Sequence, residues 1–505
     1  MHIIIHDNTT KGKTMKKLSS LIEKLDHELI CGDPDTDITS VEYDSRKVSS
    51  GSLFICISGA NSDGHRFIPD VISKGASCIV VSETPDQPVP ENVAIVKVSD
   101  TRLALALISA AWFDHPADHL TVIGITGTKG KTTTTYLVKN ILEHAGLSCG
   151  LIGTIEVIIG DEHIHTANTT PESYLIQDYF SRMVKKGIKY VVMEVSSQGL
   201  MLHRTSGFTF DIGIFTNLEP DHIGPNEHKD LDDYIRCKSL LFSQCRQGIF
   251  NADDEHLPRI LEGHTCEVTK YGLNDDADIR ADNIRLLNEP GVLGAEFDVH
   301  IPGDSLHITI PNPGTFSVYN ALCAISICYI LGIDIQTCHE GLLKTFVKGR
   351  AEHIHISDDY TLLIDYAHNA MALKSLLTTL REYNPERLVC VFGCGGNRSK
   401  SRRFEMGEVS GNLADLTIIT SDNPRFEDPL DIIADIKTGI SKTTGSYIEI
   451  PDRREAIKYA IENALPGDII ILAGKGHEDY QEIAGVKYPM DERDIIADIL
   501  HHDAP

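Results

Sequence analysis

The chain of 505 residues is too long for a single hydrophobic core and, at about 150 residues per domain, predicts roughly three domains. Its 41% hydrophobic and 24% charged residues are typical of a globular protein, and no apolar run approaches the roughly 18 residues of a membrane-spanning helix. The net charge of −27 argues against a general nucleic-acid surface, which needs a basic face.

The N-terminal stretch does not have the pattern of a secretion signal. Residues 1–14 contain an apolar run too short for a signal-peptide core and no small-residue cleavage site. An amphipathic helix begins near Met15, with apolar residues at Leu18, Leu21 and Leu25, so we interpret residues 1–14 as an extension. Twelve scattered cysteines without zinc spacing indicate reduced thiols. These features predict a cytoplasmic protein.

Residues 1–118 predict a small α/β domain, because short apolar strands alternate with helical stretches. Two polar segments, Tyr43–Arg46 and Gly59–His65, flank the first of these strands. Ligands often bind at strand ends, but on the residue pattern alone the two segments could equally be turns. The predicted strands cover residues 52–57, 78–82 and 93–97.

The most informative motif is Gly124–Thr133, where an apolar strand runs into a Gly-Lys-Thr turn and then a helix over 130–144. Small residues let backbone N–H groups close around phosphate oxygens at a helix N-terminus. Lys131 can reach the β- and γ-phosphates, and the hydroxyl of Thr132 suits Mg²⁺. The alternative is an ordinary glycine-rich β–α turn. The flanking strand and helix favour a nucleotide site.

From residue 119 long buried strands separated by helices predict a largely parallel sheet, which we assign to a central domain over 119–345. After about residue 265 the alternating pattern of several strands indicates an antiparallel appendage, followed by a helix over 317–331. The parallel strands are predicted at 121–126, 189–194 and 210–215, and the antiparallel strands at 280–286, 294–301 and 305–311.

Three residues of this domain are candidates for a metal site. Glu194 ends a buried strand, where a carboxylate is costly without a cation or donors; the alternative is an N-cap or a structural ion pair. His222 also follows a strand, although a lone histidine there is more often structural. Lys238 lies on a predicted helix, and composition alone favours a lysine whose stem packs on the core while its amine reaches solvent.

Residues 346–505 repeat a strand–helix rhythm that predicts a doubly wound, Rossmann-like domain. Polar motifs follow four of its strands, and ligands bind at that edge of such sheets. Gly393–Gly396 lacks the full dinucleotide fingerprint. The predicted strands are 360–365, 387–393, 415–420, 446–450 and 468–473, and the four polar motifs are 365–368, 393–396, 421–425 and 474–478.

Taken together, the ordered motifs resemble the Mur ligases, in particular the UDP-N-acetylmuramoyl-tripeptide synthetases (MurE type). The resemblance extends over nearly the whole chain from about Met15. Its motifs are GITGTKGKTTT, NTTPES, MEVSSQGL, TNLEPDH, YIRCKSLLF, GRAE, DYAH, GCGG, DNPR and GKGHEDYQ.

The resemblance implies three domains: a UDP-binding N-terminal domain, a central ATPase and a Rossmann-like C-terminal domain that receives an amino acid. It implies ATP-dependent amide formation between the D-glutamate of UDP-MurNAc-L-Ala-D-Glu and the amine of a third amino acid, through an acyl phosphate. ATP, Mg²⁺ and a carbamylated Lys238 are the implied cofactors and modification. The partners are then small-molecule substrates, and we expect no nucleic acid, no membrane insertion and a monomer.

By the same resemblance, Lys131, Glu194, His222 and Lys238 are the catalytic residues, and the last three join Thr132 in binding the metal. Positions for ATP are Gly127, Thr128, Lys129, Gly130, Lys131, Thr132, Thr133, Asn320, Arg350, Asp365 and His368. Positions for the UDP-MurNAc-dipeptide are Tyr43, Ser45, Ala60, Asn61, Ser62, Asn168, Thr169, Thr170, Ser196 and Arg204.

The incoming amino acid is implied to bind at Arg403, Asp422, Asn423, Pro424, Arg425, Gly474 and Glu478. The motif Asp-Asn-Pro-Arg resembles that of enzymes adding meso-diaminopimelate rather than L-lysine. Arg425 and Arg403 can pair with the distal carboxylate that only diaminopimelate has, and Glu478 can accept its distal amine.

Several positions depart from the family pattern, notably Gln198, Leu202, residues 223–228, Ser317 and Asn369. They leave open a ligase that adds L-lysine or acts on another carboxylate. A nucleotide-binding regulator without ligase activity is the alternative from a different class, and Glu194, His222 and Lys238 argue against it.

Overall fold

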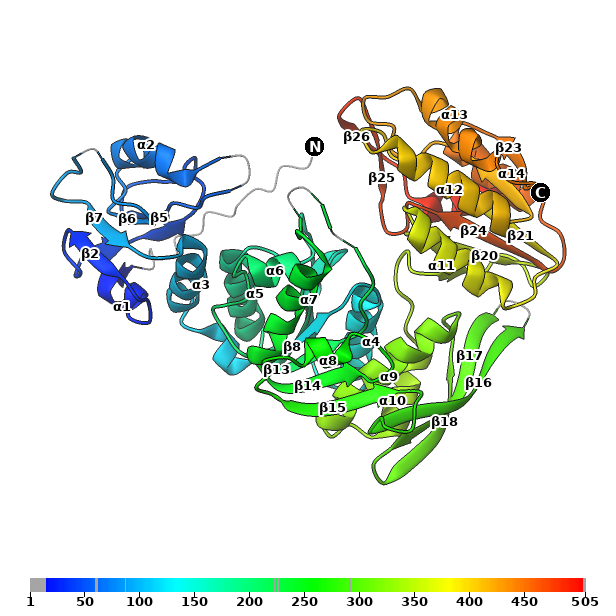
Figure 1. The fold of residues 1–505 in the computed structure, drawn as a ribbon, viewed down its shortest axis with the longest axis horizontal. Coiled ribbons are helices and arrows are strands. Elements are labelled where there is room, and N and C mark those ends of the chain that lie inside the picture. The colour runs from blue at the N-terminus through cyan, green and yellow to red at the C-terminus, as the bar shows by residue number, and fades with distance from the viewer. Residues whose placement is uncertain are drawn as a thin grey trace. The chain divides into compact units, whose positions relative to one another are not determined.

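The computed structural model of the chain describes residues 15–59, 62–86, 88–221, 223–224, 227–289 and 292–502, shown in Figure 1. The chain forms two compact units: the first contains residues 1–135, 147–250 and 254–269, and the second contains 136–146, 251–253 and 270–505. Within the described ranges, no helix combines the length and apolar character that crossing a membrane requires.

The first unit begins with a five-stranded sheet in the order β2-β7-β6-β5-β4, in which only β2 runs antiparallel to its neighbour. Because successive side chains of β5 point to opposite faces, Leu53 and Ile55 pack with α1 and α3 while Phe54 packs with α2. The elements are β1 (Lys16–Lys17), α1 (Leu18–Ile22), β2 (Glu28–Cys31), β3 (Asp37–Ile38), β4 (Ser40–Glu42), β5 (Ser52–Ile55), α2 (Ile68–Ser73), β6 (Cys78–Val81), β7 (Ala94–Lys97) and α3 (Thr101–Trp112).

Seven neighbouring strands of a larger sheet carry the Gly-Lys-Thr turn, in the order β11-β10-β9-β12-β8-β13-β14. The neighbouring strands β9, β12, β8, β13 and β14 run parallel to one another. Strand β10 pairs antiparallel with β9, and β11 pairs antiparallel with β10. The elements are β8 (Thr121–Thr126), α4 (Lys131–His144), β9 (Cys149–Ile152), β10 (Glu156–Ile159), β11 (Glu162–His165), α5 (Ser173–Lys185), β12 (Tyr190–Glu194), α6 (Ser197–Met201), β13 (Phe210–Phe215), α7 (Leu231–Ser239), β14 (Cys245–Asn251) and α8 (Leu257–Ile260).

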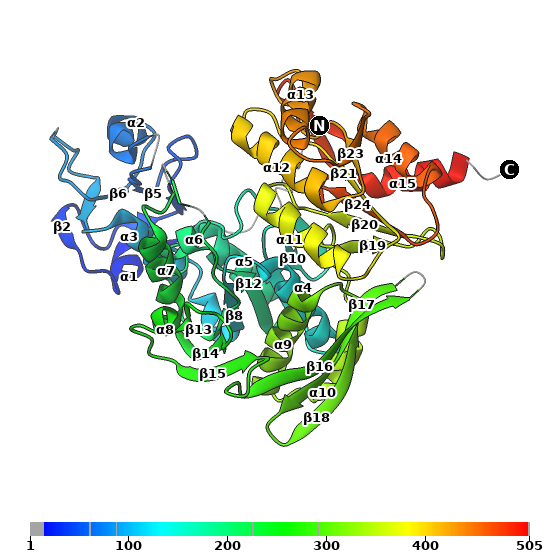
Figure 2. The same ribbon diagram turned by 45° about the vertical axis from the view of Figure 1, so that its right-hand side comes forward.

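The second unit begins with long strands, in which β16 pairs antiparallel with β17, and β17 with β18. The buried helix α9 lies against β16 and β17, as Figure 2 shows. These elements are β15 (Glu267–Gly272), β16 (Ile279–Glu289), β17 (Val292–Ile301), β18 (Asp304–Ile310), α9 (Thr315–Ile330) and α10 (Ile335–Leu343).

The last part of the second unit is a six-stranded sheet in the order β19-β20-β24-β21-β22-β23, parallel except for β19. Helices α11, α12 and α13 pack on one face, and α14 and α15 on the other. The elements are β19 (Glu352–Ile354), β20 (Thr361–Asp365), α11 (Ala370–Arg381), β21 (Arg387–Phe392), α12 (Lys400–Leu413), β22 (Leu416–Ile419), α13 (Pro429–Ile440), β23 (Ser446–Glu449), α14 (Arg453–Glu462), β24 (Asp468–Ala473), β25 (Tyr480–Ile483), β26 (Val486–Pro489) and α15 (Glu492–His502).

The mixed α/β fold with mostly parallel sheets confirms the predicted fold class, and each strand predicted from the sequence is present within a few residues of its predicted bounds. All twelve cysteines are free thiols, as expected. The domain boundaries at 118/119 and 345/346 stay a prediction.

Candidate functional site

The Gly-Lys-Thr turn lies between β8 and α4, and its backbone is shaped by close contact with the end of β13. Gly127 has φ +148°, and a Cβ at this position would lie 1.9 Å from Oγ1 of Thr216. Gly130 also adopts a positive φ, +84°. Only glycine fits the first position without moving its neighbour, which accounts for the small residues of the motif.

Polar side chains after β13 hold this turn in place. Asn217 accepts a hydrogen bond from the backbone N–H of Lys129 (2.9 Å) and donates one to its carbonyl oxygen (3.1 Å). The hydroxyl of Thr216 donates to the same carbonyl at 2.7 Å. Three hydrogen bonds therefore tie the backbone of the turn at Lys129 to the end of β13.

Two lysines meet at one backbone oxygen of the turn. The Nζ atoms of Lys131, at the start of α4, and Lys238, on α7, each lie 2.8 Å from the carbonyl oxygen of Gly127. Lys238 is 1% exposed, and its Nζ also lies 4.4 Å from the ring centre of Tyr234. Burial, together with the charge of Lys131, lowers the pKa of Lys238 well below its ordinary value.

Glu194, at the end of β12, is 1% exposed and lies beside the turn. Its Oε2 accepts from the hydroxyl of Thr132 at 2.9 Å and from that of Thr154 at 3.1 Å, while Oε1 accepts from the backbone N–H of Thr154 at 2.7 Å. A carboxylate next to the Thr hydroxyl of a phosphate-binding turn is a set of oxygen ligands that suits Mg²⁺. The residues present therefore fit this ion.

A polar pocket of about 260 Å³ opens next to these residues in the first unit. It brings together every predicted dipeptide position from Asn168 to Arg204 with the two lysines. Its lining residues are Lys131, Ala167, Asn168, Thr169, Thr170, Ser196, Ser197, Gln198, Arg204, Tyr234 and Lys238.

The predicted dipeptide positions are cross-linked to one another. The hydroxyl of Thr170 donates to the carbonyl oxygen of Glu194 at 3.0 Å and accepts from the backbone N–H of Ser196 at 2.9 Å. Arg204 donates to the carbonyl oxygen of Thr170 at 2.8 Å and pairs with Glu172 at 2.9 Å. The hydroxyl of Thr170 therefore links neighbouring parts of the pocket, and its proton is already donated within the protein.

Some predicted positions lie apart from this pocket or beyond the described residues. The ring of Tyr43 lies 6.2 Å from that of Tyr174 at the start of α5, tilted by 53°, and burial, followed by the charge of Glu172, raises the pKa of its phenol to about 12. The predicted positions Ala60, Asn61 and His222 lie outside the described residues.

In the second unit, the Gly-Arg-Ala-Glu and Asp-Tyr-Ala-His motifs meet. Asp365 accepts hydrogen bonds from the backbone N–H groups of Ala351 and Ala367, at 2.7 and 2.8 Å. The guanidinium of Arg350 lies 5.1 Å from the ring centre of Tyr366, and the ring of His368 lies 4.6 Å from it. Asn320 is buried on α9.

The loop after β22 forms a second polar cluster, centred on Asn423. Its Nδ2 donates to Oε2 of Glu478 at 2.8 Å, and its Oδ1 accepts from Nζ of Lys475 at 3.1 Å and from the backbone N–H of Glu482 at 2.9 Å. Nζ of Lys475 also lies 2.8 Å from Oε2 of Glu478. Because Asn423 is only 3% exposed, it orients its neighbours more than it faces a ligand.

The two arginines predicted to bind the distal carboxylate of diaminopimelate differ in their surroundings. Arg425 has a left-handed backbone (φ +54°), and its Nε pairs with Glu482 at 3.1 Å while Nη1 donates to the carbonyl oxygen of Gly396 at 2.7 Å. Among the described residues its Nη2 has no partner. Arg403 is 1% exposed and pairs with both Glu427 and Asp435 at 2.8 Å. Within the described ranges, both terminal nitrogens of Arg403 are therefore engaged, whereas Nη2 of Arg425 is not.

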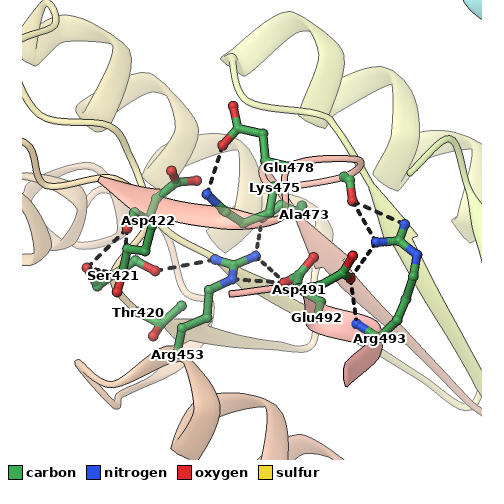
Figure 3. Close-up of polar contacts among 12 residues, drawn as sticks. Thr420, Ser421, Asp422, Arg453, Ala473, Lys475, Glu478, Asp491, Glu492 and Arg493 are labelled. Carbon is green, nitrogen blue, oxygen red and sulfur yellow. Dashed lines mark hydrogen bonds and ion pairs between the residues drawn. The ribbon is translucent and has the colours of Figure 1, made fainter. Parts of the chain in front are cut away.

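Beneath this cluster lies a buried ion pair, shown in Figure 3, that contacts the chain at the ends of β22 and β24. Arg453, at the start of α14, pairs with Glu492 at 2.8 Å, and both residues are at most 2% exposed. Its Nη2 donates to the carbonyl oxygen of Ala473 at 3.0 Å, and its Nη1 to that of Ser421 at 3.5 Å. Each carbonyl precedes one of the two loops that carry the polar cluster.

Sequence reasoning assigned no role to Lys475, to Arg453 or to a chain of hydrogen bonds in the first unit. In that chain His228 lies 3.1 Å from Asp233 and 2.8 Å from the hydroxyl of Ser197, which lines the pocket. Lys475 lies inside the Gly-Lys-Gly-His-Glu motif. Its position directly after a buried strand was the signal from which a role at the site could have been predicted. The contacts of Arg453 and the contact between His228 and Ser197 join residues far apart in the chain.

The three parts of the chain each match a family model. Residues 37–113 match the Mur ligase family, catalytic domain; residues 125–328 match the Mur ligase middle domain; and residues 349–476 match the Mur ligase, glutamate ligase domain. With the phosphate-binding turn and the α/β fold described above, these matches define the class: the chain belongs to the Mur ligase family.

Relatives of the same kind match nearly the whole chain. A protein of Caldanaerobacter subterraneus subsp. tengcongensis named UDP-N-acetylmuramoyl-L-alanyl-D-glutamate--2,6-diaminopimelate ligase is 44% identical over 489 residues. A protein of Clostridium acetobutylicum with the same name, numbered 1, is 43% identical over 487 residues. Each alignment covers 96% of this chain and 99% of the relative. A solved structure of a ligase with this name is 28% identical, with a TM-score of 0.72 over 97% of this chain and all of that one.

Proposed function

We propose that the protein is an ATP-dependent ligase that joins meso-diaminopimelate to the D-glutamate of UDP-MurNAc-L-Ala-D-Glu, a step of peptidoglycan precursor synthesis. The observation that carries the ligase chemistry is the convergence of Lys131 and Lys238 on the carbonyl oxygen of Gly127. The names of the relatives, at 44% and 43% identity over 96% of the chain, support the choice of substrates.

The reaction begins with transfer of the terminal phosphoryl group of ATP to a carboxylate oxygen of the D-glutamate, and ADP leaves. Lys131 and the backbone N–H groups of the turn bind and orient the phosphates. Thr132, Glu194 and Lys238 would hold Mg²⁺, together with His222. When bound, Mg²⁺ neutralises charge that develops on the phosphate oxygens.

The amine of diaminopimelate then attacks the carbonyl carbon of the acyl phosphate. The new C–N bond forms, the amine loses a proton, and the C–O bond to phosphate breaks. The polar pocket at Asn168–Thr170 and Ser196 would position the dipeptide. Tyr43, Ser45 and the segment 60–62 would hold the uridine, and Asn320, Arg350, Asp365 and His368 would contact ATP.

Carbamylation of Lys238 gives the buried lysine a physical role. A neutral amine adds CO₂, and the lowered pKa of Lys238 keeps this amine neutral at a pH where an exposed lysine is charged. The carbamate is an anion with two oxygens, so it would attract the neighbouring ammonium group of Lys131. Its oxygens are also suitable ligands for Mg²⁺.

The acceptor site combines opposite charges suited to an amino acid with a second ammonium and a second carboxylate. Arg425, with an open Nη2, would pair with the distal carboxylate, and Glu478 would accept the distal amine. L-lysine lacks that carboxylate and would leave Arg425 unpaired, a penalty of a few kcal/mol. A ligase for L-lysine or for a different carboxylate is the second candidate.

We also propose the domain boundaries 1–118, 119–345 and 346–505, a cytoplasmic location and a monomeric state. Hydroxylamine trapping tests the reaction type directly. With ATP, Mg²⁺ and UDP-MurNAc-L-Ala-D-Glu, an acyl phosphate yields a hydroxamate on the sugar nucleotide before any amino acid is added. ADP formation without hydroxamate, or no ADP at all, would contradict a ligase that works through an acyl phosphate.

A further inference from the structure

The glycine-rich loop after β24 places a fully buried lysine inside the acceptor site. Lys475 is 0% exposed, although a lysine is almost never fully buried unless it is paired. Its Nζ contacts Oε2 of Glu478 (2.8 Å), Oδ1 of Asn423 (3.1 Å) and the carbonyl oxygen of Tyr480. Three oxygen acceptors around three N–H donors satisfy the ammonium completely.

The two oxygens of the Glu478 carboxylate differ in their hydrogen bonds. Oε2 accepts from both Lys475 and Asn423, each at 2.8 Å. No hydrogen bond to Oε1 exists among the residues that the structure describes. One oxygen therefore fixes the carboxylate, and the other keeps its acceptor capacity for a ligand.

We propose that Lys475 is a positioning residue of the acceptor site, which holds the Glu478 carboxylate through Oε2 so that Oε1 remains free for the ammonium group of the incoming amino acid. This inference rests on the proposed function. It assigns Lys475 a part in specificity that acts through Glu478, without contact to the substrate itself.

The charge of Glu478 follows from the same arrangement. Burial alone raises the pKa of this carboxyl, but the charge and hydrogen bond of Lys475, with the hydrogen bond of Asn423, outweigh burial and hold the pKa below its ordinary value. His477 from the same loop also faces Glu478, as does Tyr366 from the end of β20. A carboxylate that stays ionised can bind an ammonium at any pH near neutrality.

The buried pair beneath the loops helps to hold this geometry. Arg453 binds the carbonyl oxygens of Ser421 and Ala473, which lie two residues before Asn423 and Lys475 respectively. The strand ends are thereby fixed relative to each other, and so are the partners that Lys475 joins (Figure 3).

The test removes the charge of Lys475 by substitution and compares the KM values for diaminopimelate and for ATP. Lys475→Met should raise the KM for diaminopimelate about 10- to 100-fold and leave the KM for ATP within about twofold. Lys487→Met is the matched control, because Lys487 is exposed and lies 3.8 Å from the centre of the ring of Tyr480, whose carbonyl oxygen accepts from Lys475, but does not bind Glu478. Equal increases for both substrates, or an equal effect of the control, would overturn the proposal.

The pH profile separates a positioning role from a merely structural one. Without Lys475, burial raises the pKa of Glu478, so its charge is lost as the pH falls from neutrality. As the pH falls, the KM for diaminopimelate should therefore begin to rise at a higher pH in Lys475→Met than in the native enzyme. His477 is present in both proteins, so the difference reports Lys475. Coincident profiles would contradict the proposal.

A double-mutant cycle supplies the last readout. If Lys475 acts through Glu478, adding Lys475→Met to Glu478→Gln raises the KM no further than Glu478→Gln alone; additive effects would refute this. Should Lys475→Met not fold, Lys475→Gln keeps a donor, loses the charge and carries the same pH prediction. Failure of the native protein to use diaminopimelate would instead reject the proposed function, so the two failures are distinguishable.

Discussion

Lys131 and Lys238 share one acceptor, the carbonyl oxygen of Gly127, with both Nζ atoms 2.8 Å from it. Two ammonium groups at one oxygen would repel each other, and burial together with the charge of Lys131 lowers the pKa of Lys238. Such an arrangement is costly unless a ligand or a modification compensates it. In the proposed function, phosphate oxygens would compensate Lys131, and a carbamate would compensate Lys238.

Removal of the buried lysine tests its role as a carbamate. Lys238→Ala should abolish ligase activity, because the turn loses a group that would hold Mg²⁺, and short carboxylic acids should restore part of it. The measurement is phosphate release with and without added acetate or formate. Lys229→Ala changes an exposed lysine and serves as the control. Full activity of Lys238→Ala without added acid would disprove the carbamate.

The carbamate also predicts a dependence on CO₂ and pH. Burial and the charge of Lys131 lower the pKa of Lys238, so more of its amine is neutral than in an exposed lysine at the same pH, and protonation increases as the pH falls. Dialysis against CO₂-free buffer at mildly acidic pH should reduce activity, and bicarbonate at neutral pH should restore it. Activity that is indifferent to both treatments would count against the modification.

The contact between Thr132 and Glu194 predicts a shared dependence on magnesium. Thr132→Ala and Glu194→Gln should each raise the Mg²⁺ concentration for half-maximal activity, by about 10- to 100-fold. Thr154→Ala is an informative comparison, because Thr154 also donates to Glu194 at 3.1 Å but lies outside the phosphate turn. An unchanged Mg²⁺ requirement in the first two variants would place the ion elsewhere.

Arg425 predicts selectivity for an acceptor with a distal carboxylate. Arg425→Ala should raise the KM for diaminopimelate far more than the KM for ATP, because Nη2 is the open donor of this site. Steady-state kinetics with each substrate varied in turn provide the measurement. Arg454→Ala, which removes an exposed arginine paired with Asp498, should change neither constant. Equal increases in both constants for Arg425→Ala would assign it another role.

The Arg453–Glu492 pair predicts a large loss of stability when one partner is removed. Arg453→Met leaves Glu492 buried and unpaired, which costs about 3–5 kcal/mol. The thermal midpoint should fall by several degrees, measured by calorimetry against Arg454→Met as the exposed control. The double variant Arg453→Met/Glu492→Leu should recover part of the loss, since it removes both charges. Single variants that melt like the native protein would contradict this account.

The local parts of the site were predictable from sequence. The turn after β8 combines an apolar strand, glycines and a lysine within ten residues, and each requirement is met by neighbours in the chain. Asp365 and the loop Asp422–Arg425 were likewise predictable as strand-end polar residues, because parallel strands present their carboxyl ends at one edge.

The remaining contacts depend on residues far apart in the chain. Nζ of Lys238 reaches a carbonyl oxygen 111 residues away, and composition alone favoured a lysine that reaches solvent. Lys475 meets Asn423 across 52 residues. The pairing of Arg403 with Glu427 and Asp435 was also hidden, since a sequence gives residue types without showing which donors are already engaged. Short, polar strands such as β25 and β26 lack the apolar run that marks a buried strand.

The most direct test of the central claim is a competition assay. Purified protein is supplied with ATP, Mg²⁺ and UDP-MurNAc-L-Ala-D-Glu, and diaminopimelate and L-lysine are offered together at equal concentration. We predict release of phosphate and a tripeptide product that carries diaminopimelate almost exclusively. A product that carries mainly lysine, or no phosphate release with either amino acid, would contradict the account.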